Sequence, residues 1–183
     1  MNEGGWPAWA TEAVEIAEPD PRWDRRAREL RGAVQQTLQP WLTAAVEHVG
    51  STAVAGLPAK PIIDLMAPVA ALEDLELVAA MVATPGWHHV PPVLDLRPWR
   101  RFFVLVEDGR RAAHLHLLRA GDPRLADMAV FRDRLRCSPR LAAEYAAMKH
   151  RLADEHRADR EAYTEAKTGF VVRVVHGEGP LGL

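Results

Sequence analysis

The chain has 183 residues, 48% hydrophobic and 26% charged, which indicates one soluble globular domain and excludes intrinsic disorder, collagen-like repeats and coiled-coil rods. Its 23 Lys and Arg against 25 Asp and Glu give a net charge of −2, so there is no strong nucleic-acid signal. One cysteine, Cys137, excludes a disulfide scaffold, and no apolar run reaches the roughly 18 residues of a membrane span. We therefore expect a cytoplasmic protein with a single domain over residues 1–183, no membrane partner and a poorly ordered segment at residues 1–10.

Strands and helices alternate in the first half of the chain. The expected elements are a strand (11–17), a helix (22–42), a strand (45–49), one helical turn (52–55), a strand (61–69) and a helix (72–83). The first helix is indicated by apolar side chains at 3.6-residue spacing: Trp23, Ala27, Leu30, Val34 and Leu38.

The second half begins with a hairpin and continues as helices. Strands over residues 101–106 and 112–118 flank the turn Glu107-Asp108-Gly109, and His88-His89 is expected in a loop. Residues 123–175 predict three helices, with breaks near Ser138-Pro139 and at residues 154–159. The class is therefore α+β, with a mixed sheet, packed helices and a helical C-terminal third.

Two features of residues 48–64 can carry chemistry. Gly50-Ser51 ends a strand and opens a helical turn, so free backbone N–H groups and a hydroxyl can hold a phosphate there. Asp64 lies in an otherwise apolar strand, where a carboxylate is costly to bury unless it is paired or binds a metal. The alternative is an ordinary turn followed by an Asp that caps a loop. Together, the two features favour a functional site.

Residues 47–65 resemble the signature of the GrpB family, which is placed in the nucleotidyltransferase superfamily. Further resemblance lies at His114-Leu115-His116, residues 131–136, residues 145–149 and residues 163–170. This resemblance implies a nucleotidyltransferase-like core over most of the chain. The superfamily pattern is a hydrophobic residue followed by Gly and Gly or Ser, then a spacer, then two carboxylates two residues apart. Val49-Gly50-Ser51 and Asp64 fit it, but Met66 stands where the second carboxylate is expected.

The resemblance implies a divalent metal ion, which we expect at Asp64. One Asp is a poor frame for two Mg²⁺ ions, but His114 and His116 share one face of a strand and can complete the site. Imidazole ligands favour Mn²⁺, Zn²⁺, Ni²⁺ or Fe²⁺ over Mg²⁺. The alternative is a pair of exposed histidines that bind nothing. The resemblance favours a site role, for His116 before His114.

The expected ligands are a nucleoside triphosphate and a divalent metal (Mg²⁺, Mn²⁺ or Zn²⁺). Glu47 and His48 are candidates for a catalytic base beside Asp64, on proximity to the Gly-Ser turn alone. The candidates for phosphate binding are Gly50, Ser51, Lys60 and Arg101. The resemblance implies four more, because they match family positions: Arg132, Lys149, Tyr163 and Lys167. The arginines around the hairpin form either a phosphate-binding rim or a solvated face: Arg97, Arg100, Arg101, Arg110 and Arg111.

Three functions are compatible with this sequence. The first is transfer of a nucleotidyl group to an unidentified acceptor, either a small molecule or a protein. The second, favoured by Met66, is a non-catalytic nucleotide-binding or folding-accessory domain. The third is a tailoring enzyme that uses the same pocket on a small metabolite.

Overall fold

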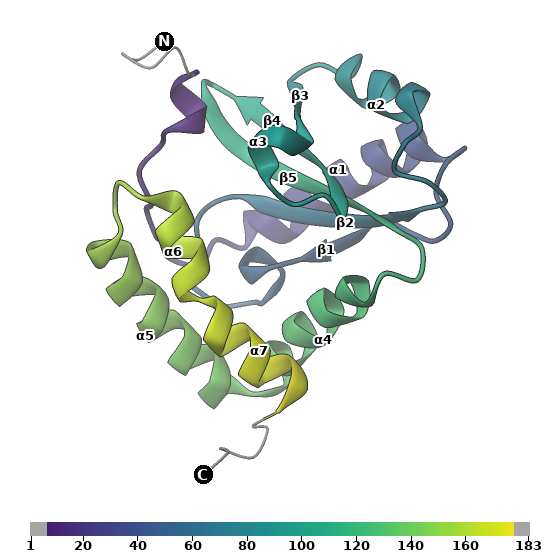
Figure 1. Cartoon of the computed structure of the whole chain (residues 1–183). Coiled ribbons are helices and arrows are strands. Elements are labelled where there is room, and N and C mark those ends of the chain that lie inside the picture. Colours follow the sequence, from purple (N-terminus) through teal and green to yellow (C-terminus); the bar gives the residue numbers. More distant parts are fainter. Residues whose placement is uncertain (1–6, 178–183) are drawn as a thin grey trace.

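The computed structural model describes residues 7–177, and its centre is a five-stranded sheet in the order β1-β2-β5-β4-β3 (Figure 1). The strands are Glu47–Val49 (β1), Ile63–Val69 (β2), Trp87–Val90 (β3), Arg100–Glu107 (β4) and Arg110–Arg119 (β5). β2 and β5 pair in parallel, and the other neighbours pair antiparallel. The α+β class with a mixed sheet, predicted from the sequence, is confirmed.

Two helices cover one face of the sheet. They are α1 (Arg22–Leu38) and α2 (Leu75–Val82), and the side chain of Asp74 caps α2 by accepting from the backbone N–H of Glu76. The helices and the inward side chains of the sheet form one apolar core. Because side chains alternate along a strand, burial of Leu65 and Leu115 in this core turns Asp64 and His114 to the opposite face.

Four helices stand on the opposite side of the sheet (Figure 1). They are α4 (Pro123–Cys137), α5 (Pro139–Glu155), α6 (Arg160–Ala166) and α7 (Thr168–His176). Side chains of Asp122, Ser138 and Asp159 cap α4, α5 and α6. These helices have a core of their own, built around Phe131, Tyr145 and Phe170. Among the described residues no helix is both long and apolar enough to cross a membrane.

The predicted hairpin is confirmed. β4 and β5 pair around Asp108-Gly109, where both residues have positive φ (50° and 74°), as a tight two-residue turn requires. The predicted turn after β1 is also present, as the short 3-10 helix η2 (Ser51–Ala53).

Several element predictions were wrong. Residues 11–17 form no strand and contribute only a bridge from Ala17 to Ala59, because their backbone groups bond to scattered partners such as the carbonyl of Arg157. α1 ends at Leu38 rather than at residue 42, since Pro40 cannot continue the helix.

His88-His89 was expected in a loop but lies in β3, paired with β4. The short helix α3 (Pro92–Asp95) was not predicted. The last of the three predicted C-terminal helices is divided into two helices, α6 and α7. They meet at Lys167, before the weak helix formers Thr168 and Gly169. Most of the N-terminal segment expected to be poorly ordered (residues 1–6) lies outside the described residues, and Ala8–Ala10 form one 3-10 turn, η1.

Candidate functional site

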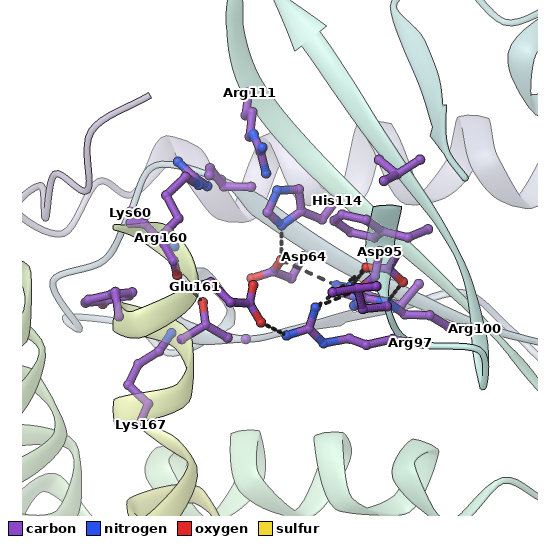
Figure 2. Close-up of a pocket in the computed structure, with 18 of the residues that line it drawn as sticks. Lys60, Asp64, Asp95, Arg97, Arg100, Arg111, His114, Arg160, Glu161 and Lys167 are labelled. Atoms are coloured by element: carbon purple, nitrogen blue, oxygen red, sulfur yellow. Dashed lines mark hydrogen bonds and ion pairs between the residues drawn. The ribbon is translucent and has the colours of Figure 1, made fainter. Parts of the chain in front are cut away.

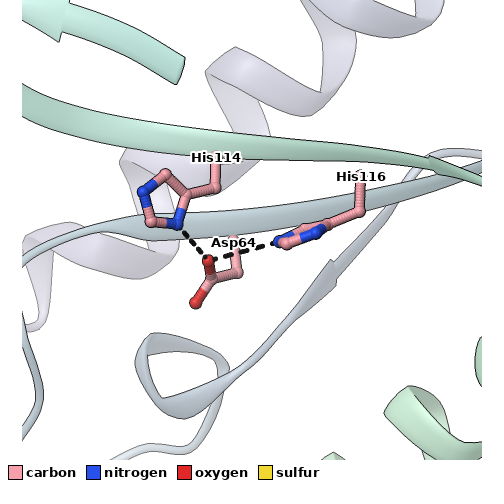
Figure 3. A group of neighbouring side chains, drawn as sticks. All are labelled: Asp64, His114 and His116. Atoms are coloured by element: carbon pink, nitrogen blue, oxygen red, sulfur yellow. Dashed lines mark hydrogen bonds and ion pairs between the residues drawn. The ribbon is translucent and has the colours of Figure 1, made fainter. Parts of the chain in front are cut away.

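Asp64, His114 and His116 meet on the sheet face that is turned away from α1 (Figure 3). The parallel register places Asp64 opposite His114 and Met66 opposite His116. Nδ1 of His114 lies 3.0 Å from Oδ1 of Asp64, and Nε2 of His116 lies 3.7 Å from the same oxygen. The ligand atoms of the three side chains all lie within 4.8 Å of one another, so they form a group that can surround one cation.

The surroundings of this group keep Asp64 ionised and both histidines neutral. Burial alone would raise the pKa of Asp64, but interactions with His114 and His116 outweigh it and hold that pKa well below its usual range. Burial lowers the pKa of His114 to about 4 and also lowers the pKa of His116. A carboxylate beside neutral imidazoles is the protonation state in which such residues ligate metals.

Gly50 packs directly against the Asp64 carboxylate. Its φ of 71° is in the left-handed region, and a Cβ added to it would lie 2.5 Å from Oδ2 of Asp64. Only glycine allows the backbone to turn there at that distance. The next residue, Ser51, hydrogen-bonds to the Tyr145 side chain of α5, so the Gly-Ser turn joins the sheet to the C-terminal helices.

His116 has a second polar partner, Arg100 of β4. Nη1 of Arg100 lies 2.5 Å from Nδ1 of His116. The same guanidinium donates to both carboxylate oxygens of Asp95, from Nε at 2.8 Å and from Nη2 at 2.5 Å. Asp95 and Arg100 are both buried, so a continuous polar chain runs from α3 to Asp64.

A cavity of about 1080 Å³ opens over this sheet face, between the sheet and the C-terminal helices. Asp64 and His114 lie in its middle (Figure 2). Lys60, Arg160 and Lys167 lie on one side of Asp64, and Asp95, Arg97 and Arg100 lie on the other. The cavity is large enough for a nucleotide-sized ligand.

All three lysines of the chain line this one cavity: Lys60, Lys149 and Lys167. No carboxylate forms an ion pair with any of them within residues 7–177. Burial, with repulsion from neighbouring cations, lowers the pKa of Lys60 and of Lys149 to about 7, and burial lowers that of Lys167 to about 8. Buried amines without an anionic partner are costly, so this side of the cavity is suited to an anion.

Tyr163 of α6 is buried between two of these amines. Nζ of Lys60 lies 4.7 Å from the centre of its ring, and Nζ of Lys167 lies 4.3 Å from it. Cation–π contacts of this kind hold the amines in place without neutralising them. Lys149 is held differently, by donation from Nζ to the carbonyl of Pro58.

An ion pair crosses the cavity on the opposite side. Nη2 of Arg97 lies 2.5 Å from Oε1 of Glu161 and so joins the segment after α3 to α6. Arg97, Arg100 and the acids Asp95 and Glu161 balance one another in this part. The net positive charge is therefore concentrated around the lysines.

The structure brings together nine of the predicted site residues in this cavity. They are Gly50, Ser51, Lys60, Asp64, His114, His116, Tyr163 and Lys167, and Lys149 lines it as well. The pairing of Asp64 with His114 and His116 follows from strand alternation and a parallel register.

Four predicted residues lie elsewhere. Arg132 donates to Oε2 of Glu47 at 2.8 Å and to the carbonyl of His48 at 3.0 Å, which fastens α4 to β1. His48 is buried with Nε2 3.0 Å from Oγ1 of Thr52, and does not line the cavity. Arg101 is displaced from the cavity because it alternates with Arg100 along β4.

Sequence reasoning missed several charged residues of the cavity. They are Asp95, Arg124, Asp127, Arg160 and Glu161. Of the predicted hairpin cluster, Arg97, Arg100 and Arg111 line the cavity and Arg110 does not. A strand starting at residue 100 instead of 101 would have placed Arg100 on the same face as Phe102, which pairs with His116.

Comparisons with known proteins place the chain in a family. The family described as GrpB protein matches residues 13–176. A UPF0157 protein of Pseudomonas aeruginosa is 36% identical over 178 residues, which covers 93% of this chain and 69% of that protein. A dephospho-CoA kinase of Mycolicibacterium paratuberculosis is 27% identical over 176 residues, covering 84% of this chain but 43% of the kinase.

The fold has also been seen in a solved structure. GrpB from Enterococcus faecalis superposes with a TM-score of 0.76 at 27% identity, covering 87% of this chain and 94% of that one. The expected family is therefore confirmed by sequence and by fold.

Proposed function

The chain belongs to the GrpB family, and from that premise we propose that it binds a nucleoside triphosphate together with a divalent cation and transfers the nucleotidyl group to an acceptor. One observation carries the proposal: every lysine of the chain faces one cavity that has a charged carboxylate and neutral imidazoles at its centre. A polyphosphate would supply the anionic partner that these lysines do not have, and a cation would supply a positively charged partner for the Asp64 carboxylate.

The chain's own residues bind and orient the ligand. Lys60 and Lys167 lie on one side of Asp64, where they neutralise phosphate oxygens. Backbone N–H groups of the Gly50-Ser51 turn donate to a phosphate beside the carboxylate. The α-phosphorus then accepts a bond from the acceptor's oxygen or nitrogen, the acceptor's proton passes to water, and pyrophosphate leaves with the electrons of the broken P–O bond.

Asp64 and His114 fit a divalent cation. In the cation-free protein, Nδ1 of His114 donates to Oδ1 of Asp64 at 3.0 Å, and these two atoms would hold a cation that displaces the shared proton. A bound cation would neutralise the charge that develops on the phosphates during transfer. A mixed oxygen and nitrogen donor set favours Mn²⁺ or Zn²⁺ over Mg²⁺.

A second function, nucleotide binding without catalysis, is favoured by Met66. This buried side chain occupies the position two residues after Asp64, where the resembled superfamily has a second carboxylate. Two-metal transfer is not available to such a site. The match to part of a dephospho-CoA kinase is compatible with a domain that accompanies another enzyme.

Thermal unfolding with added ligands tests the binding proposal. We expect ATP or inorganic tripolyphosphate, each with Mn²⁺, Zn²⁺ or Mg²⁺, to raise the melting temperature, since a ligand of the folded state stabilises it. Lys60→Met and Lys167→Met should each weaken this rise, whereas Arg151→Met, which removes an exposed cation of α5, should leave it unchanged. An equal rise in all four proteins would contradict the proposal.

Release of pyrophosphate separates the two functions. Transfer predicts pyrophosphate from ATP and Mn²⁺ when a suitable hydroxyl or amine is present, and its loss in Asp64→Asn. Tight binding of ATP without pyrophosphate release from any acceptor in a broad panel of small molecules and proteins would support the non-catalytic function.

A further inference from the structure

The two histidines beside Asp64 differ in their second partners. Nδ1 of His116 lies 2.5 Å from Nη1 of Arg100, whereas Nε2 of His114 is buried and has no hydrogen-bond partner within residues 7–177. The protonated nitrogen of a neutral histidine is set by the hydrogen bonds of the ring. In the cation-free protein, Nδ1–H of His114 donates to the acceptor-only carboxylate of Asp64 at 3.0 Å. Because no donor faces Nε2 of His114, its proton can move there when a cation binds at Nδ1, whereas Arg100 excludes a proton from Nδ1 of His116.

Arg100 is itself held firmly in place. It makes a two-pronged contact with Asp95, at 2.8 Å and 2.5 Å, and its guanidinium carbon lies 4.1 Å from the centre of the Phe102 ring. Both charged partners are buried, with 8% of Arg100 and 6% of Asp95 exposed. A planar guanidinium pinned on two sides has little freedom to turn away from His116.

The chemistry of arginine decides which nitrogen of His116 carries the proton. A guanidinium has only donors, so Nδ1 of His116 must accept, and a neutral ring with a bare Nδ1 carries its proton on Nε2. Nε2 faces Oδ1 of Asp64 at 3.7 Å. A protonated ring nitrogen has no lone pair in the ring plane and cannot ligate a cation.

We propose that Asp95 and Arg100 hold His116 as the tautomer protonated at Nε2, which makes His116 a positioning residue for Asp64 and leaves Asp64 and His114 as the protein's metal ligands. The proposal rests on the metal-dependent function above. It departs from the sequence-based expectation, which ranked His116 before His114 as a ligand.

The arrangement has a consequence for substrate binding. A cation with two protein ligands keeps most of its coordination positions for water and phosphate oxygens, as is common where a metal binds together with a nucleotide. The cation and the triphosphate should therefore strengthen each other's binding. His116 contributes by directing the positive end of its Nε2–H dipole at Oδ1 of Asp64, 3.7 Å away.

Nuclear magnetic resonance of the native protein reads the tautomer directly. In ¹⁵N-labelled protein at pH 7.5, long-range correlations from the ring protons distinguish a protonated from a bare nitrogen, and His116→Gln and His114→Gln assign the two rings. We expect His116 to be protonated at Nε2 both before and after Zn²⁺ is added, while Nδ1 of His114 shifts on coordination. Protonation of His116 at Nδ1, or a Zn²⁺-induced coordination shift at its Nε2, would overturn the proposal.

Metal affinity of variants gives an independent measurement. Glutamine places an amide N–H close to the position of Nε2, so His116→Gln should change Zn²⁺ affinity by less than about tenfold, within the range of outer-shell effects. His114→Gln should lose more than about a hundredfold, because a ligand is removed and outer-shell losses reach about that size. The reverse order would overturn the proposal.

A paired substitution tests the role of the Asp95–Arg100 pair. Asp95→Asn with Arg100→Gln removes both charges together, which avoids an unpaired buried ion. Gln can accept from Nδ1, so His116 can then present a bare Nε2, and Zn²⁺ affinity should rise at least about tenfold, the size of an outer-shell effect. Unchanged affinity, with His116 still protonated at Nε2, would contradict the role of the pair. A native protein that binds no Zn²⁺ or Mn²⁺ would refute the metal site, while the tautomer is still decided by the native spectra.

Discussion

At the scale of single residues, Gly50 gives the site its shape. Its positive φ and the 2.5 Å approach of an added Cβ to Asp64 both exclude a side chain. Gly50→Ala should lower the free energy of unfolding by about 1–3 kcal/mol, the cost of a strained backbone. Chemical denaturation measures this change, and Gly32→Ala, on the open surface of α1, is the matched control. Equal losses in the two variants would show that the contact with Asp64 is unimportant.

The charge of Asp64 should also make the free energy of unfolding depend on pH in the acid range. Its pKa in the folded protein is depressed below the usual value of 3.8, so its charged form stabilises the fold above that pH, and the contribution is lost as the pH falls. Asp64→Asn should therefore be less stable than the native protein at pH 6, by about 1 kcal/mol or less for a partly exposed group, and the difference should shrink toward pH 2.5. A difference that grows on acidification would contradict this assignment.

At the scale of elements, the contact between α4 and β1 is structural in our interpretation. Arg132 is held by Glu47 and by the carbonyl of His48, outside the cavity. Arg132→Ala and Glu47→Ala should each lower the free energy of unfolding by about 1 kcal/mol. In the double variant, the interaction energy between the two substitutions should be about 1 kcal/mol or less. Binding of ATP with Mn²⁺, measured by calorimetry, should be unchanged. A loss of ATP affinity larger than about tenfold (1.4 kcal/mol) would instead show that both residues contribute to ATP binding.

The lysines of the cavity come from α5, from the junction of α6 and α7 and from the segment before β2, and they predict that anion binding changes the number of bound protons. At pH 8 Lys60 and Lys149 are largely neutral, because each has a pKa of about 7, and Lys167 is about half charged at a pKa of about 8. A bound polyphosphate favours the charged amines and raises these pKa values. Tripolyphosphate binding at pH 8 should therefore take up protons, which titration calorimetry in buffers of different ionisation enthalpy detects. No uptake, or release, would mean that the lysines are not the anion's partners.

At the scale of the whole molecule, the fold was easier to predict than the composition of the cavity. Asp108-Gly109 and the apolar run around Asp64 carry strong local signals, and both were interpreted correctly. β3 and α3, at four residues each, are too short to show a period, so they were missed. Asp95 lies in α3, so its contact with Arg100 was not predicted either.

Which residues face the cavity depends on how helices pack, and local sequence does not report that. Lys149, Arg160 and Lys167 converge only because α5 and α6 stand across the cavity from the sheet (Figure 1). Arg132 belongs to the same helical region, yet it faces β1. Strand alternation, by contrast, is a local rule, and it correctly brought Asp64 together with His114 and His116.

The most direct test of the central claim is the affinity for ATP with and without Mn²⁺, measured by titration calorimetry on the native protein and on Asp64→Asn. If the cation is held at Asp64 beside the lysines, Mn²⁺ should raise the ATP affinity of the native protein at least about tenfold, equivalent to about 1.4 kcal/mol. Asp64→Asn should still bind ATP through the lysines but gain nothing from Mn²⁺. An equal Mn²⁺-dependent gain in both proteins, or no binding of ATP to the native protein, would contradict the account.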